Sequence, residues 1–191
     1  MKRLFIAIKL VPNASILSVY NSLRKELSYN KIRWVEPTNF HLTLKFIGET
    51  QENKIPYIID IIKNTIDSYG KIKLDVNKIG IFGSSYKPRI IWLGIAENKK
   101  IDNLANDMIN NLDAAGFVKD TQNFVPHFTI GRITNIIDKK TFNHSIEKQR
   151  NVIFQKIEVK NIVLYESILS GKNTRYNEIY RFSLTKQITI T

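Results

Sequence analysis

The sequence contains one four-residue pattern twice: histidine, any residue, threonine and an apolar residue. The pattern stands at residues 41–44 as HLTL and at 127–130 as HFTI, and the chain has three histidines in all. Alternate residues of a β-strand point to the same face, so His41 and Thr43 share one face, as do His127 and Thr129. Because an imidazole and a hydroxyl on a core strand need polar partners, these four side chains are candidates for a site.

One copy of this pattern is more often a hydrogen-bonded core histidine beside a threonine that favours strands. Two copies at matching places indicate two faces brought together across a cleft. Histidine has an ordinary pKa of about 6.5, so one ring can be neutral while the other is protonated. This pair suits in-line displacement at phosphorus: one ring takes a proton from water and the other protonates the leaving oxygen. The hydroxyls can hold the non-bridging oxygens, and nothing in the pattern requires a metal or another cofactor.

The elements that position these patterns also occur twice, in the order strand, helix, strand, His-x-Thr strand, helix, strand. Apolar residues at helical spacing predict helices at 16–27 after an Asn13 cap, and at 55–69, 101–112 and 138–149. Strands are predicted at 4–11, 32–36, 41–47 (ended by Gly48), 71–82, 89–95, 116–120, 125–133, 152–169 and 175–185.

This duplication predicts an α+β fold with two similar lobes related by a pseudo-twofold axis. We expect two mainly antiparallel sheets, with helices on their outer faces and a central cleft between the lobes. No linker-like or low-complexity stretch divides the halves, so residues 1–191 are expected to form a single two-lobed domain.

Composition restricts the partners. The formal net charge of +12 favours polyanions, chiefly nucleic acid or an anionic membrane surface. The lack of cysteine excludes disulfides, thiolate metal sites and cysteine nucleophiles, and fits a reducing compartment. The N-terminal apolar run imitates a signal peptide, but Lys9 interrupts it and no small-residue cleavage site follows. No segment approaches the roughly 18 apolar residues of a membrane helix. We therefore expect a soluble, cytoplasmic protein. A monomer is the expected state, although composition does not decide it.

The flanks of both patterns carry a family resemblance. The stretches RWVEPTNFHLTLKFIGE, KPRIIWLGI and FVPHFTIGR resemble the RNA 2',3'-cyclic phosphodiesterases, also called 2'-5' RNA ligases, of the two-histidine phosphoesterase superfamily. The resemblance implies a bilobal fold and metal-independent hydrolysis of RNA 2',3'-cyclic phosphate ends to 2'-phosphomonoesters. It implies His41 as the proton donor, His127 as the proton acceptor, and Thr43 and Thr129 as phosphate ligands. Its partners would be RNA ends, with tRNA fragments among the candidates.

Two basic residues near the patterns are candidates for substrate binding. Lys45 follows Thr43 by two residues, so alternation places it on the face of His41. Relatives in the resembling family commonly have an arginine at the place of Arg132, but simple alternation puts Arg132 on the core face. Either a bulge near Gly131 turns it toward the phosphate, or it serves the lobe interface or the surface.

Other candidates have weaker support. Aromatic residues at strand positions are usually core, but four of them could stack on a base: Trp34, Phe82, Trp92 and Tyr176. His144, in the short polar helix near the C-terminal strands, lacks a threonine partner and is expected at the surface.

Three alternative functions remain open at this point. The same site could run in reverse and join a 2',3'-cyclic end to a 5' hydroxyl through a 2'-5' link. The chain could instead be a non-catalytic RNA-binding module whose histidines bind phosphate, with salt-sensitive binding and no turnover. The third alternative, a metal ion held between the two histidines, has the weakest support, because no carboxylate pair accompanies them.

Overall fold

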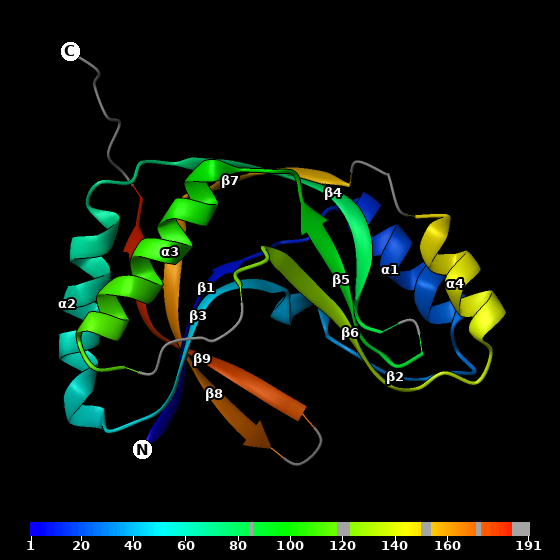
Figure 1. The fold of residues 1–191 in the computed structure, drawn as a ribbon, viewed down its shortest axis with the longest axis horizontal. Coiled ribbons are helices and arrows are strands. Elements are labelled where there is room, and N and C mark those ends of the chain that lie inside the picture. The colour runs from blue at the N-terminus through cyan, green and yellow to red at the C-terminus, as the bar shows by residue number, and fades with distance from the viewer. Residues whose placement is uncertain (85, 118–122, 150–153, 171–172, 185–191) are drawn as a thin grey trace.

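The computed structural model describes residues 1–84, 86–117, 123–149, 154–170 and 173–184 (Figure 1). The strands are β1 (Lys2–Lys9), β2 (Lys31–Trp34), β3 (His41–Thr50), β4 (Ile72–Gly83), β5 (Pro88–Ile95), β6 (His127–Asn135), β7 (Gln155–Val159), β8 (Asn161–Ser170) and β9 (Asn173–Ser183). The α-helices are α1 (Ala14–Glu26), α2 (Ile55–Ile66), α3 (Lys99–Ala114) and α4 (Lys139–Glu147), and short 3-10 turns lie at Pro37–Asn39 and Glu52–Lys54.

The described strands form one antiparallel sheet in the order β7-β4-β5-β6-β3-β1-β8-β9, with β2 added beside β6. The two expected sheets meet in the middle of this order, where β3 pairs with β6 at Leu42 and Phe128. These are the residues between histidine and threonine in the two patterns. The His-x-Thr strands therefore join the two halves of the molecule themselves.

The duplication predicted from the sequence is visible on both sides of this junction. β1 runs beside β3 as β5 runs beside β6, so that Lys9 lies opposite His41 and Gly94 lies opposite His127. One strand of each half pairs with a strand of the other half. β4, from the first half, pairs with β5 of the second half, and β8, from the second half, pairs with β1 of the first half. Each lobe is thus built from both halves of the sequence.

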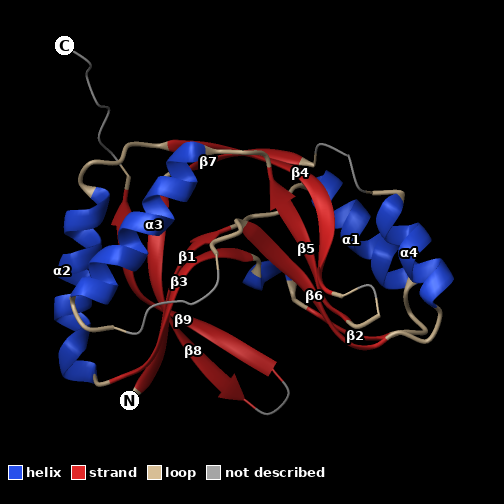
Figure 2. Cartoon of the chain, in the orientation of Figure 1, coloured by secondary structure: helices blue, strands red, loops and turns tan. Residues whose placement is uncertain are grey.

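Helices cover the outer face of the curled sheet. Figure 2 shows α2 and α3 together over one lobe and α1 and α4 together over the other, and both helix pairs are in contact. The Asn13 side chain caps α1 by accepting a hydrogen bond from the Ile16 N–H at 3.0 Å, as predicted. Leu42 and Phe128 point into the main core on this outer side and are fully buried. The opposite, concave face is left for the site.

The α+β bilobal fold with an antiparallel sheet and outer helices is confirmed. Two predicted strands differ from the observed ones in more than their end residues. Gly48 does not end β3, since its positive φ of 85° fits a bulge that lets the strand continue to Thr50. The predicted strand 152–169 is divided into β7 and β8. Most of the predicted strand 116–120 lies outside the described residues, as do 152–153, 171–172 and Thr185.

Among the described residues, no helix has both the length and the apolar character needed to cross a membrane.

Candidate active site

The two histidines lie on the concave face, next to the junction of the lobes. Pairing of Leu42 with Phe128 places His41 opposite Thr129, and Thr43 opposite His127, by continuation of the antiparallel register. Directly opposed residues share a face, so all four side chains lie together on the face opposite the core. The histidines are diagonal neighbours across this pair, a relation that usually sets residues about 7–8 Å apart.

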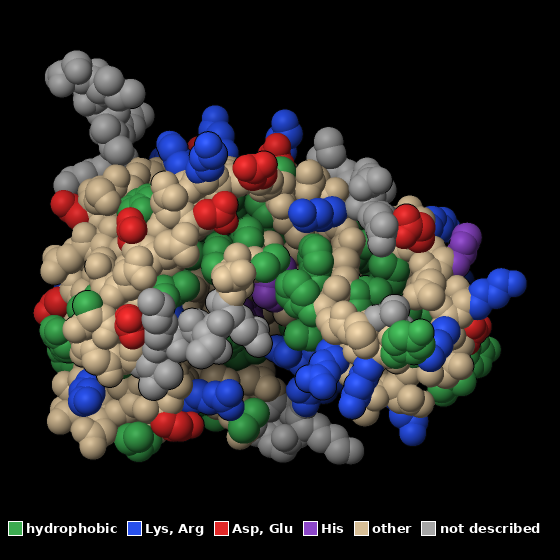
Figure 3. All heavy atoms as spheres, viewed as in Figure 1, with side chains coloured by type: hydrophobic (Ala, Val, Ile, Leu, Met, Phe, Trp, Pro, Cys, Tyr) green, Lys and Arg blue, Asp and Glu red, His purple; other side chains and the backbone are tan. Residues whose placement is uncertain are grey.

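The space-filling view shows how this face is shaped. In Figure 3 a hollow lies between the two lobes with a histidine side chain at its bottom, and lysine and arginine side chains gather along one rim. Both motif histidines are half-buried, as are Thr43 and Thr129. The site is therefore open to a ligand and partly shielded from water.

Each imidazole is held by the same kind of hydrogen bond. The Nδ1 atom of His41 lies 2.7 Å from the backbone oxygen of Asn39, and that of His127 lies 2.7 Å from the backbone oxygen of Val125. A carbonyl oxygen can only accept, so Nδ1 carries the proton in both rings. The other nitrogen of each ring, Nε2, then carries no proton in the neutral ring, so it can accept one there and donate one when the ring is charged.

Both histidines have pKa values below the ordinary value of 6.5. Burial is the main cause for each, and it is opposed by the hydrogen bond to the backbone oxygen. The positive charge of Arg132 lowers both pKa values further, and a charge on His127 lowers that of His41. Because protonation of one ring disfavours protonation of the other, the pair readily holds a single proton, as an acid and a base require.

A β-bulge in β3 overturns the prediction for Lys45. Thr43 lies opposite Ala7 and Lys45 lies opposite Ile6, so Leu44 is an extra residue in the strand. Since opposed residues share a face, Lys45 lies with Ile6 on the core face, where it is 1% exposed. The expectation that Lys45 shares the face of the first histidine is therefore wrong.

A bulge at the matching place in β6 has the opposite consequence for Arg132. Trp92 and Ile91 of β5 lie opposite Thr129 and Gly131, so one residue of β6 is extra between them. The bulge that the sequence left open near Gly131 is thus present. It reverses the alternation, places Arg132 on the concave face with Thr129, and leaves its side chain exposed.

Aromatic rings flank the first histidine. The centroid of the His41 ring lies 5.1 Å from that of Phe5 and 5.0 Å from that of Tyr176, with an edge-on contact in the second pair. Tyr176 was expected as a stacking candidate, whereas Phe5 was not. A small pocket beside them is lined by Lys9, Thr38, Asn39, Phe40, His41, Tyr165 and Tyr176.

Aromatic rings flank the second histidine in the same way. Phe82 meets the His127 ring edge-on at 4.7 Å between centroids, and Trp92 lies at 6.4 Å. Two glycines make room for the indole, because a Cβ on Gly80 or Gly94 would lie 2.2 Å or 2.6 Å from its ring carbons. Phe82 and Trp92 are therefore wall residues of the site, as the sequence allowed.

Two of the sequence candidates lie elsewhere. Trp34 packs edge-on against Tyr20 at 5.6 Å on the core side of β2, so it offers no face to a ligand in the cleft. His144 is exposed on α4, as expected. Across the described parts of the chain, no group of three His, Asp or Glu side chains is placed to hold a metal ion.

Two lysines near the histidines were missed by the sequence analysis. Lys9 lies directly opposite His41 in β1. Lys78 of β4 crosses over Gly94, since a Cβ on that glycine would lie 2.7 Å from the Lys78 side chain. Both lysines are exposed. Their sequence signal was alternation within each strand, but only the pairing of the strands reveals that they stand beside the histidines.

Comparison with known proteins agrees with this geometry. The sequence model of the family described as LigT like Phosphoesterase matches the chain twice, at residues 8–92 and 93–176, with one His-x-Thr strand in each match. The chain belongs to the LigT-like phosphoesterase family. The resemblance drawn from the motifs is thereby confirmed, and the two matches correspond to the two halves related by the pseudo-twofold axis.

Relatives and solved structures extend the match over nearly the whole chain. An RNA 2',3'-cyclic phosphodiesterase of Aquifex aeolicus is 34% identical over 89% of this chain and 92% of its own. One of Methanocaldococcus jannaschii is 34% identical over 93% of this chain and 98% of its own. The crystal structure of E. coli LigT complexed with 3'-AMP shares the fold, with a TM-score of 0.77 at 24% identity, over 97% of this chain and 99% of that chain.

Proposed function

We propose that the protein hydrolyses 2',3'-cyclic phosphate ends of RNA to 2'-phosphomonoesters. The observation that supports the proposal is that two imidazoles protonated at Nδ1 and two hydroxyls share one concave face. The names of the relatives and membership of a phosphoesterase family support the same substrate class.

The reaction requires two proton transfers on opposite sides of phosphorus. Nε2 of His127 takes a proton from water while the water oxygen forms a bond to phosphorus. The bond between phosphorus and the 3' oxygen breaks, and Nε2 of protonated His41 gives its proton to that oxygen. The product keeps the phosphate on the 2' oxygen. The direction of the pair, with His41 as donor and His127 as acceptor, follows the family resemblance.

The remaining side chains would hold the phosphate. The hydroxyls of Thr43 and Thr129 can donate to non-bridging oxygens, whose charge must be stabilised in the transition state. The guanidinium of Arg132 adds a cation on the same face. Lys45 has no place in this scheme, because the bulge in β3 turns it into the core.

The substrate and setting follow from the same proposal. RNA ends are the proposed partners, with tRNA fragments among the candidates, and the basic rim of the hollow supports a polyanionic ligand. The monomeric state, the cytoplasmic location and the single-domain assignment stay predictions.

The test is an assay with a nucleoside 2',3'-cyclic phosphate in excess EDTA, with the product isomer identified by ³¹P NMR. We expect turnover that is undiminished by the chelator and a product with the phosphate on the 2' oxygen. Binding without turnover would support a non-catalytic module, and a 3'-phosphate product would contradict the assigned geometry. A 2'-5' joined product with RNA half-molecules would show that the reverse direction dominates.

The pH profile gives a further prediction. The pH dependence of kcat/KM reports the pKa values of groups in the free enzyme. The pKa values of both motif histidines lie below 6.5. We therefore expect the kcat/KM optimum to lie on the acid side of pH 6.5. The bound cyclic phosphate carries one negative charge, which favours protonated rings, so the kcat optimum should lie at higher pH. A kcat/KM optimum well above pH 7 would contradict the lowered pKa values of the two histidines.

Replacing Arg132 tests the bulge in β6. We expect Arg132→Gln to lower kcat/KM about tenfold, because it removes one charge-assisted contact to the phosphate. It should also move the kcat/KM optimum to higher pH, since the Arg132 charge lowers both histidine pKa values. The control is Lys100→Gln, which also removes one positive charge but does so on α3. A loss of activity without any pH shift would place Arg132 away from the rings.

A further inference from the structure

The pseudo-twofold axis brings two different side chains to equivalent places beside the site. Phe46 stands three residues after Thr43, and Arg132 stands three residues after Thr129. Each follows a bulge at the matching place in its strand, so each lies two strand positions beyond its threonine on the concave face. The His-x-Thr half-sites are alike, but one is followed by an aromatic ring and the other by a cation.

The Phe46 side chain is exposed although its neighbours are buried. It is 56% exposed, whereas Phe5, directly opposite in β1, is 2% exposed. A single exposed apolar side chain is common on protein surfaces and needs no function. Here, however, the ring of Phe5 lies 6.0 Å from that of Phe46 and 5.1 Å from that of His41, between centroids. One buried ring thus connects the exposed ring to an imidazole of the site.

The same buried ring gives Phe46 a firm support. The rings of Tyr165 and Tyr176 lie 5.3 Å and 5.1 Å from that of Phe5, in a small apolar cluster on the concave face. Phe46 therefore rests against a packed group of side chains while much of its own surface stays open. A supported ring loses little conformational freedom when a flat ligand stacks on it.

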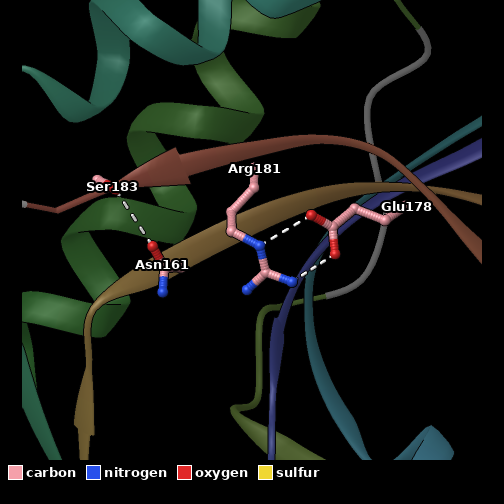
Figure 4. Close-up of polar contacts among 4 residues, drawn as sticks. All are labelled: Asn161, Glu178, Arg181 and Ser183. Atoms are coloured by element: carbon pink, nitrogen blue, oxygen red, sulfur yellow. Dashed lines mark hydrogen bonds and ion pairs between the residues drawn. The ribbon is translucent and has the colours of Figure 1, made fainter.

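The carboxylates of this lobe do not prevent an anionic ligand from approaching. Glu178 lies opposite Tyr165 in the hairpin, and both of its oxygens accept hydrogen bonds from Arg181 (Figure 4). Glu49, further along β3, lies opposite Arg3. Because an arginine stands beside each carboxylate, the aromatic surface remains compatible with a nucleotide.

The position of Phe46 suits the base of a nucleotide whose phosphate lies in the site. Two strand positions correspond to about 7 Å between the Cα atoms of Phe46 and Thr43, the proposed phosphate ligand. A phenyl ring cannot hold a phosphate, but it can stack on a base of any sequence. The longer side chain of Arg132, at the equivalent place, ends in a cation that can reach back to the phosphate.

We propose that Phe46 stacks on the base of the terminal nucleotide and so fixes the orientation of the ligand between the two half-sites. The inference rests on the proposed function and deepens it. Two similar half-sites alone would let either oxygen of the cyclic phosphate face the proton donor. With the base held on β3 and the phosphate contacted by Arg132, one orientation is preferred, and the 3' oxygen is the one that leaves.

The experiment compares two substrates that differ only in the base: adenosine 2',3'-cyclic phosphate and methyl ribofuranoside 2',3'-cyclic phosphate. We expect the wild-type protein to show the higher kcat/KM with the nucleotide. Phe46→Ala should lower that kcat/KM about tenfold, as the loss of one stacked base does, and should change the value for the methyl riboside less than about twofold. The share of 3'-phosphate in the product from the nucleotide, followed by ³¹P NMR, should rise.

Three further variants serve as controls. Phe46→Tyr keeps the ring and should behave as the wild type, whereas Phe46→Leu keeps an apolar side chain without a ring and should behave as Phe46→Ala. Tyr57→Ala removes an aromatic side chain of similar exposure, 54%, from α2 and should leave both substrates unaffected.

The outcomes separate this inference from the proposed function. If Phe46→Ala changes neither kcat/KM, or both by the same factor, the assignment of Phe46 is wrong while the proposed function stands. A lower kcat/KM with an unchanged product isomer would overturn the role in orientation. If the wild type hydrolyses neither substrate, the proposed function fails, and calorimetric titration with adenosine 2'-phosphate and methyl ribofuranoside 2'-phosphate tests Phe46 by itself. Tighter binding of the nucleotide that is lost in Phe46→Ala would support the base contact, and equal binding would overturn it.

Discussion

Alanine at His41 or at His127 is expected to lower kcat by about 100- to 10,000-fold with a nucleoside 2',3'-cyclic phosphate. In the proposed mechanism each ring supplies one of two proton transfers on opposite sides of the phosphorus, so neither ring should be able to replace the other. The double variant should be little worse than either single one, because groups that act as a unit are not additive. Steady-state kinetics of the three variants checks this.

The control for this prediction is His144→Ala, the third histidine of the chain, which is exposed on α4. It should retain wild-type kinetics. Circular dichroism and thermal unfolding will show whether the motif variants keep the fold, since both rings lie on the concave face and outside the main core. A folded His41→Ala or His127→Ala protein with near-wild-type kcat would contradict the assigned roles.

Valine at Thr43 or Thr129 is the second change with a large expected effect. Valine keeps the branched shape that a strand favours but removes the hydroxyl donor. Loss of one such donor to a developing charge costs on the order of 100-fold in kcat, so we expect kcat to fall by about that factor while KM changes little. Serine at the same positions keeps the hydroxyl and is the matched control.

The two threonine variants also test the pseudo-twofold arrangement. Thr43 and Thr129 lie at equivalent places beside the junction of β3 and β6, so both should contribute. Serine variants that lose as much activity as the valine variants would show that packing rather than the hydroxyl matters. A loss at only one of the two positions would mean that the phosphate sits asymmetrically.

Much of this site is predictable from the sequence. The His-x-Thr pattern at residues 41–44 and 127–130, repeated in a repeated order of elements, predicted two half-sites that meet. The structure brings them together through Leu42 and Phe128. Period-two alternation within each strand was enough to separate the core residue from the polar ones on either side of it.

The failures arose where alternation breaks. A bulge adds one residue to a strand and reverses the faces of all residues after it, and neither Leu44 nor Ile130 has a side chain that signals one. The bulge in β3 moves Lys45 into the core, against the prediction, whereas the bulge in β6 turns Arg132 onto the concave face, which is one of the two alternatives that the sequence left open. Because the two bulges occupy matching positions, the duplication extends to this irregularity.

Residues contributed by distant strands were also out of reach. These residues stand on strands whose partners are decided by pairing across the whole fold. Phe5 and Lys9 are on β1, which pairs with β3, and Lys78 is on β4, which pairs with β5. Local patterns give the face of a residue within its own strand. They do not give the residue that lies opposite on the adjacent strand, because that depends on the register of the whole sheet.

The most direct test of the shared site uses the histidine rings themselves. With three histidines in the chain, long-range ¹H–¹⁵N spectra can follow each ring during titration with a nucleoside 2'-phosphate. We predict that His41 and His127 shift together, with one common saturation curve and raised pKa values, while His144 does not respond. A response from only one motif histidine, or two responses with different affinities, would contradict a single phosphate held between both rings.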